Sequence, residues 1–178
     1  CVFLNNSGNY NGHSGMGLYF DNGILRVLRT DFIDNKAGAN YGYGGAGVYL
    51  GNNAATSATF SNCVFRGNEA LFASSLNPGY GGAMWLNLAA GATARVVNCT
   101  FTENANRNGD GGAIYLSDGT LILKNSILWN NDVDDGYTGS ELYRAGGMLS
   151  VDYCDLTGLS SPYVVGDATL SNCMVNDP

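Results

Sequence analysis

The chain has 178 residues, of which 45% are hydrophobic and only 13% are charged, and this excludes a disordered protein because disordered chains are rich in charge and poor in aromatic residues. A net charge of −7 with eight Lys and Arg residues is a poor match for nucleic acid, so we expect no nucleic-acid partner. The sequence has no apolar run of about eighteen residues, which predicts no membrane insertion of this segment.

The N-terminal part of the chain introduces three short apolar segments. They are "CVFLNN" (1–6), "GMGLYF" (15–20) and "GILRVLR" (23–29), and Gly, Asn, Asp and Ser separate them. Short apolar segments between such residues are typical of strands joined by turns. The sequence shows no convincing amphipathic helix of about ten or more residues.

All three segments recur along the chain. Copies of the first are "TDFIDN" (30–35), "CVFRGN" (63–68), "CTFTEN" (99–104), "SILWNN" (126–131) and "CDLTG" (154–158). Copies of the second are "GAGVYL" (45–50), "GGAMWL" (81–86), "GGAIYL" (111–116) and "SELYR" (140–144). Copies of the third are "ATFSN" (58–62), "ARVVN" (94–98), "TLILKN" (120–125), "MLSVDY" (148–153) and "ATLSN" (168–172). A period of about thirty residues without helices predicts an all-β fold, a right-handed parallel β-helix solenoid of about six coils with three short strands per coil. We expect residues 1–178 to form a single domain.

In such a solenoid, equivalent residues of successive coils lie on top of one another. The pleat then sends Ile114 and Leu116 inward and sends Ala113 and Tyr115 outward. The residues equivalent to Ala113 in the other coils are also expected to face outward, and they are Gly17, Gly47, Ala83 and Glu141. The Phe/Leu position of the first segment is predicted to form a core column of Phe3, Phe32, Phe65, Phe101, Leu128 and Leu156. The Asn three residues later predicts a hydrogen-bonded turn ladder of Asn6, Asn35, Asn68, Asn104 and Asn131, in which Asn is suited to the left-handed conformation. A second possible ladder is Asn62, Asn98, Asn125 and Asn172.

An aromatic column is predicted between the inward positions of the second segment. Its members are Tyr19, Tyr49, Trp85, Tyr115 and Tyr143. One interpretation is that these rings stack on one another or lie under loops and stabilise the fold. The other is a glycan-binding or adhesive strip on the outside of the solenoid.

The five cysteines all fall at one position of the repeat, where Thr30 and Ser126 stand in other coils. They are Cys1, Cys63, Cys99, Cys154 and Cys173. The spacing is not that of a zinc site. In-register stacking is compatible with disulfides that join Cys63 to Cys99 and Cys154 to Cys173, and equally with stacked free thiols.

The densest acidic stretch is "NNDVDDG" (130–136). Asp132, Asp134 and Asp135 are candidate oxygen ligands for Ca²⁺, although a solvated turn explains them as well and the spacing is not that of the twelve-residue calcium loop. We expect no other cofactor. The remaining carboxylates do not form a cluster across coils, and the one histidine, His13, has no placed catalytic partner, so no catalytic residue is predicted.

The motifs "FxxN" and "GGAIY" resemble the repeats of chlamydial polymorphic outer-membrane proteins and, more widely, bacterial surface proteins with pectate-lyase-like β-helices. "NSILWNND", "SELY" and "LSVDYCDLTG" are similar to the last coils of secreted β-helix proteins that carry sorting or anchoring domains downstream. The resemblance implies a bacterial module that is secreted or displayed at the cell surface and is a segment of a longer exported protein. It implies no catalytic residues.

The sequence is compatible with two kinds of function. The first is a non-catalytic structural or adhesive module that contacts a polysaccharide, a host or neighbouring cell surface, or further copies of itself. The alternative is a carbohydrate-active enzyme, a polysaccharide lyase or hydrolase, whose site would use the long segments "KAGANYGYGG" (36–45) and "EALFASSLNPGYGG" (69–82).

Overall fold

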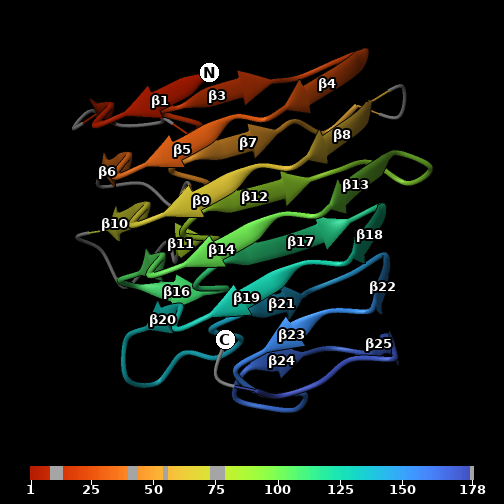
Figure 1. Cartoon of the computed structure of the whole chain (residues 1–178). Coiled ribbons are helices and arrows are strands. Elements are labelled where there is room, and N and C mark those ends of the chain that lie inside the picture. Colours follow the sequence, from red (N-terminus) through yellow and green to blue (C-terminus); the bar gives the residue numbers. More distant parts are fainter. Residues whose placement is uncertain (9–13, 40–43, 54–55, 73–78, 177–178) are drawn as a thin grey trace.

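A computed structural model describes residues 1–8, 14–39, 44–53, 56–72 and 79–176 of the chain. The strands stack one above another from the first segment to the last, and every recorded pairing between them is parallel (Figure 1). The described residues include no helix, and none of their segments is a helix that could cross a membrane. The prediction of an all-β parallel solenoid is therefore confirmed, while its handedness and its number of coils stay predictions.

The first repeated segment forms one sheet of six strands. Its strands in order are β1 (Val2–Leu4), β5 (Asp31–Ile33), β9 (Val64–Arg66), β14 (Thr100–Thr102), β19 (Ile127–Trp129) and β23 (Asp155–Leu156). The second segment forms a six-stranded sheet of β3 (Leu18–Phe20), β7 (Val48–Leu50), β12 (Met84–Asn87), β17 (Ile114–Asp118), β21 (Leu142–Arg144) and β24 (Val164–Val165). Each predicted segment type therefore builds a sheet of its own.

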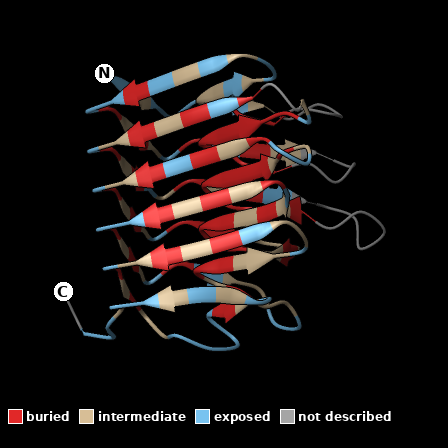
Figure 2. Cartoon of the chain, turned by 90° about the vertical axis from the view of Figure 1, so that its right-hand side faces the viewer, coloured by how far each residue is buried: buried red, intermediate tan, exposed pale blue. Residues whose placement is uncertain are grey.

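The third segment forms the sheet with the longest strands. They are β4 (Ile24–Leu28), β8 (Ser57–Ser61), β13 (Thr93–Val97), β18 (Thr120–Lys124), β22 (Met148–Asp152) and β25 (Ala168–Ser171). Buried and exposed positions alternate along these strands, as Figure 2 shows, because successive side chains of a strand point to opposite faces.

The structure adds short strands that the sequence analysis, with three strands per coil, did not predict. They follow the buried Asn position and form a five-stranded sheet of β2 (Ser7–Gly8), β6 (Lys36–Ala39), β10 (Glu69–Phe72), β15 (Ala105–Asn106) and β20 (Asp132–Val133). A separate pair consists of β11 (Gly79–Tyr80) and β16 (Gly109–Asp110). Val133 is the one β-branched residue in these strands, and most of the others are small or polar, so local propensity gave no signal for them. The parallel neighbours supply their hydrogen bonds.

The core is built from the predicted columns. Ile114 is the register partner of Met84, and both are fully buried. In the Phe column the ring centroids of Phe32 and Phe65 lie 4.8 Å apart, and those of Phe65 and Phe101 lie 4.4 Å apart with parallel planes. Stacking of equivalent residues, the central prediction from the repeat, is therefore confirmed.

Candidate functional site

The aromatic column lies on the sheet that β17 and its neighbours form. Its rings contact one another in sequence. Tyr19 stacks on Tyr49 and Tyr115 stacks on Tyr143, with ring centroids 4.8 Å and 5.1 Å apart. Tyr49 and Trp85 meet edge to face, with centroids 4.9 Å apart. The sequence analysis missed one member, because Tyr80 comes from the short strand β11. Its ring stands 4.9 Å from that of Trp85 and 4.8 Å from that of Tyr115, so it completes the contact between them.

The middle of this column is covered. Tyr49 and Trp85 are 9% and 8% exposed, whereas Tyr19 at the first coil is 58% exposed. The indole nitrogen of Trp85 donates a hydrogen bond to Ser117 Oγ at 2.9 Å, and Asn87 Nδ2 donates one to the hydroxyl of Tyr49 at 3.1 Å. Burial raises the pKa of Tyr115 well above its ordinary value. The rings therefore pack against one another in stacked, tilted and edge-on pairs, and Tyr19 is the member with the most open surface.

The side chains that flank the aromatic column differ from the prediction. Ala83 and Ala113 were expected to face outward, but both are fully buried in the core. Glu141, which takes the equivalent position in β21's coil, is also fully buried. The reason is that these residues lie at the corner before the strand, where the alternation of a pleated strand does not apply.

The buried Asn ladder is confirmed. Asn35 Nδ2 donates to Asn68 Oδ1 at 2.8 Å, and Asn68 Nδ2 donates to Asn104 Oδ1 at 2.9 Å. The second amide hydrogen of Asn68 goes to the carbonyl oxygen of Phe32 at 2.8 Å. Every amide in the ladder donates toward the C-terminal end, where Asn131 Nδ2 donates to a carboxylate oxygen of Glu141.

Glu141 ends this ladder because the last coil has Leu159 where earlier coils have Asn. Its other carboxylate oxygen accepts a hydrogen bond from Thr157 Oγ1. Burial raises the pKa of Glu141 above its ordinary value, although the hydrogen bonds from Thr157 and Asn131 oppose the rise. Glu141 is therefore a structural cap at the end of the ladder. The sequence showed it only as a Glu at a position that was predicted to face outward.

The cysteine column is a set of free thiols. Cys63, Cys99 and Cys154 are buried, and the thiols of Cys63 and Cys99 face backbone carbonyl oxygens of their own and the preceding coil. Burial raises the pKa of Cys154 to about 11, so its thiol stays protonated at neutral pH. The interior Cys position therefore acts as a small apolar residue in this structure.

The acidic turn that was predicted as a candidate Ca²⁺ site lies beside a cation of the protein. Arg107 NH1 is 2.7 Å from Asp132 Oδ2 and 3.6 Å from Asp134 Oδ1. Arg107 Nε also contacts Glu69, whose other carboxylate oxygen is 2.9 Å from Lys36 Nζ. The structure brings Asp132, Asp134 and Asp135 together around a hollow of about 470 Å³, but among the described residues no group of three or more His, Cys, Asp or Glu is arranged to hold a metal ion.

A ladder of alternating charges crosses the five-stranded sheet from β6 through β10 to β20, and its members are Lys36, Glu69, Arg107 and Asp132. Burial acts to raise the pKa of Glu69, but the hydrogen bonds from Lys36 and Arg107 outweigh it and hold the pKa below its ordinary value. The ladder was not predicted because Lys36, Glu69 and Asp132 lie on short strands that the alignment of the repeats does not contain. Binding of Ca²⁺ by the acidic turn stays a prediction, and Arg107 neutralises part of the negative charge of Asp132 and Asp134.

The loops that were considered for an enzyme are only partly visible. Residues 40–43 and 73–78, the centres of the two segments, and His13 lie outside the described residues. The flanking strands β6 and β10 pair in register, so the two segments do start side by side, as predicted from stacking.

Comparison with known proteins finds a partial similarity to a bacterial protein. The chain is 32% identical over 105 residues to the probable autotransporter YfaL of Escherichia coli (strain K12), a match that covers 57% of this chain and 8% of that protein. No protein-family profile matches the chain, and no solved structure matches it significantly. The chain therefore shares a partial similarity with an autotransporter, and it corresponds to a small part of that protein's length.

Proposed function

We propose that the chain is a non-catalytic structural module of an exported bacterial surface protein, a rigid rod that displays binding surfaces. One observation carries the proposal: the chain's repeats stack in parallel register from β1 to β23, and 105 residues of the chain are similar to part of a probable autotransporter. A solenoid of this kind is stiff because every coil is hydrogen-bonded to the next, and its outer faces tolerate change without loss of the core.

The repeated residues support a structural role. Phe65 and Asn68 repeat because they hold coils together, and both are fully buried. The buried carboxyl of Glu141 contacts Asn131 and Thr157, a fold-stabilising arrangement. These contacts explain why the repeat is kept along the chain without reference to a reaction.

Cell-surface display is tested with the full-length reading frame in its bacterial host. A peptide tag inserted at Gly136, which lies in an exposed turn with nothing within 4 Å of an added Cβ, should be accessible to antibody and protease on intact cells. A tag at buried Ala94 is the matched control and should abolish display because it disrupts the core. A tag at Gly136 that is protected in intact cells and exposed only after lysis contradicts the proposal.

Glycan contact and self-association are further parts of the proposal. Tyr19 offers an exposed ring for a sugar. Val2, Leu4, Ile24 and Leu28 of the first strands are between 53% and 78% exposed, an apolar surface that a further coil, from a longer chain or from a second copy, would cover. Tyr19→Ala should weaken glycan-array binding, whereas Tyr163→Ala, at an exposed Tyr outside the column, should not. Sedimentation velocity should show concentration-dependent association that Ile24→Lys removes.

An enzyme remains the competing function. Release of unsaturated or reducing ends from pectin- or alginate-type polysaccharides by purified protein would overturn the non-catalytic proposal. We expect none above a heat-inactivated control.

A further inference from the structure

The sheet formed by the third segment has an outer face that neither the aromatic column nor the charge ladder uses. Alternate residues of its strands point outward, and their register partners form vertical columns. The middle outward column consists of Arg26, Thr59, Arg95, Ile122, Ser150 and Thr169. We call this outer face, with the hollow described below, the basic face.

The basic face collects cations in an acidic chain. Arg26, Arg95 and Lys124, three of the eight Lys and Arg residues, lie on it, although the net charge of the chain is −7. Lys124 Nζ is 3.3 Å from Asp152 Oδ2 and is thus partly neutralised. Arg26 and Arg95 are exposed and make no ion pair with any residue that the structure describes.

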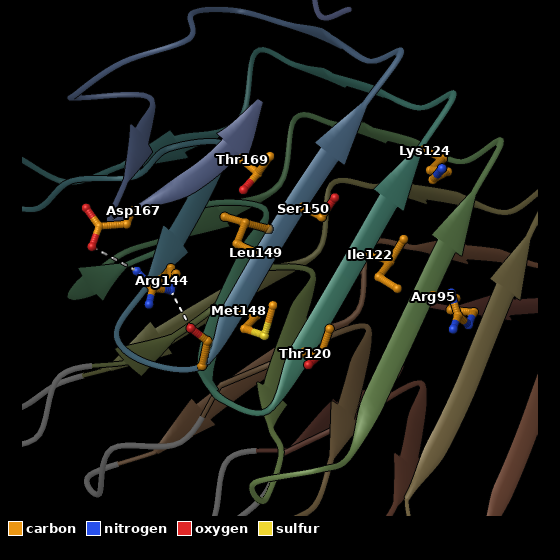
Figure 3. A pocket seen from close by; sticks show the side chains of 11 residues that line it. Arg95, Thr120, Ile122, Lys124, Arg144, Met148, Leu149, Ser150, Asp167 and Thr169 are labelled. Atoms are coloured by element: carbon orange, nitrogen blue, oxygen red, sulfur yellow. Dashed lines mark hydrogen bonds and ion pairs between the residues drawn. The ribbon is translucent and has the colours of Figure 1, made fainter. Parts of the chain in front are cut away.

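A hollow of about 440 Å³ opens on the C-terminal half of this face, and Figure 3 shows its lining. Arg95 and Lys124 lie on one side, Ile122 and the 70% exposed Met148 form an apolar floor, and Arg144 closes the far edge. Arg144 Nε donates a hydrogen bond to the carbonyl oxygen of Gly147 at 2.8 Å, which holds the guanidinium at the rim.

The polar groups around this floor are mostly hydroxyls. Thr120, Ser150 and Thr169 line the hollow, and Asp167, 3.6 Å from Arg144, is the one carboxylate in its lining. Cations, hydroxyls and a small apolar floor together match a ligand that carries anionic groups, hydroxyls and apolar C–H surface. An acidic sugar has all three.

The distance between Arg26 and Arg95 indicates which kind of polyanion the basic face fits. Arg26 and Arg95 are separated by one strand, that of Thr59, so their Cα atoms stand roughly 10 Å apart along the solenoid. Duplex DNA carries a charge every ~1.7 Å along its axis, a density that two unpaired cations on an acidic chain do not match. A linear glycan with an anionic group on some of its sugars has a sparser charge that fits this spacing.

We propose that the basic face binds a linear acidic glycan, carboxylated or sulfated, laid across the strands along the solenoid axis. Arg26 and Arg95 contact separate anionic groups, Thr59 hydrogen-bonds a sugar hydroxyl between them, and the hollow receives the C–H face of a further sugar. The inference extends the proposed function by naming a ligand class and a surface, and surface display of the rod does not depend on it.

The test measures binding of three fluorescent polysaccharides and of a fluorescent DNA duplex to the purified chain by anisotropy at low salt. Hyaluronan fragments supply carboxylates, dextran sulfate supplies sulfates, and neutral dextran is the uncharged control. We expect one or both acidic polymers to bind and dextran not to bind. Arg95→Gln should weaken binding about fivefold, and Arg26→Gln with Arg95→Gln about twentyfold, with a log–log salt slope lower by about one per arginine.

Arg66→Gln is the matched control, since Arg66 is an exposed arginine of strand β9 on a neighbouring sheet and forms no ion pair within the described part of the chain. It removes the same charge from the chain, and binding should change less than about twofold. Far-UV circular dichroism verifies that each variant is folded. The inference is overturned if neither acidic polymer binds more tightly than dextran, if Arg66→Gln weakens binding as much as Arg95→Gln, or if duplex DNA binds more tightly than both glycans.

Discussion

Two asparagine columns flank the sheet of the first segment, one before and one after its strands, and they are kept for different physical reasons. In the first, Asn35, Asn68 and Asn104 are fully buried, and their side chains hydrogen-bond from coil to coil. In the second, Asn62 and Asn98 are exposed, and Asn98 Nδ2 donates a long hydrogen bond of 3.4 Å to Asn62 Oδ1. Here the backbone conformation favours Asn, because the φ angles of the two residues are 55° and 53°, in the left-handed region.

The difference teaches that a repeated residue type does not reveal its role. The left-handed residue at the first corner is the one before the ladder Asn, such as Asp34 with φ 52° or Gly67 with φ 63°. The predicted left-handed conformation therefore belongs to a neighbour of the ladder and not to the ladder itself. The second column tolerates Arg29 and Tyr153 at equivalent places, both with positive φ, because no buried amide is needed there.

The largest effect is expected from breaking the buried column. Asn68→Asp keeps the size of the side chain but removes both amide hydrogens, so a carboxylate would face the Phe32 carbonyl and Asn104 Oδ1 in a buried site. We expect a loss of about 3 kcal/mol or more in the free energy of unfolding at neutral pH, measured by urea titration. Asn98→Asp, the exposed counterpart, should change it by less than about 0.5 kcal/mol, and equal losses would refute the distinction.

A smaller effect is expected from breaking the backbone requirement of the exposed column. Asn98→Val places a β-branched side chain at φ 53° and should cost about 1–2 kcal/mol. Asn98→Gly should be nearly neutral, because glycine adopts this conformation without strain. Urea midpoints of the two variants against the unchanged chain supply the measurement, and a stable Val variant would show that the side chain, not the backbone, selects Asn.

The end of the buried ladder should make stability depend on pH. The pKa of Glu141 is raised by burial, so the native state binds more protons than the unfolded state as pH rises above the ordinary value of a Glu carboxyl. Stability should therefore fall as pH rises through that window and level off above the native pKa. Glu141→Gln should remove this slope in a series of urea titrations, and an identical slope in the variant would contradict the assignment.

The smallest effect is expected at the exposed charge ladder, where the sign is opposite. Glu69 has a lowered pKa in the native state, so its contribution is present above the ordinary Glu pKa and is lost as pH falls through the native value. Arg107→Gln removes the contacts to Glu69 and Asp132 and should cost less than about 1 kcal/mol at neutral pH and little in acid, because these groups are solvated. A loss that persists unchanged in acid would indicate packing rather than charge.

The sequence by itself determined the properties that repeat. A chain with the same three segments in every period can pair its backbone N–H and C=O groups and bury its apolar residues by stacking equivalent segments on one another. The Phe column, the Asn ladder and the pairing of Met84 with Ile114 therefore followed from alignment of the segments. Fold class was predictable for that reason.

Only the tertiary structure decided the features that do not repeat. Tyr80 enters the aromatic column from a different strand, and Glu141 replaces an Asn that is missing a coil later. Arg26, Arg95 and Lys124 looked scattered in the sequence, and they share a face because five-residue strands in register present the same side outward. Repeats encode the interior through local spacing, whereas the outer faces depend on which single residues the register brings together.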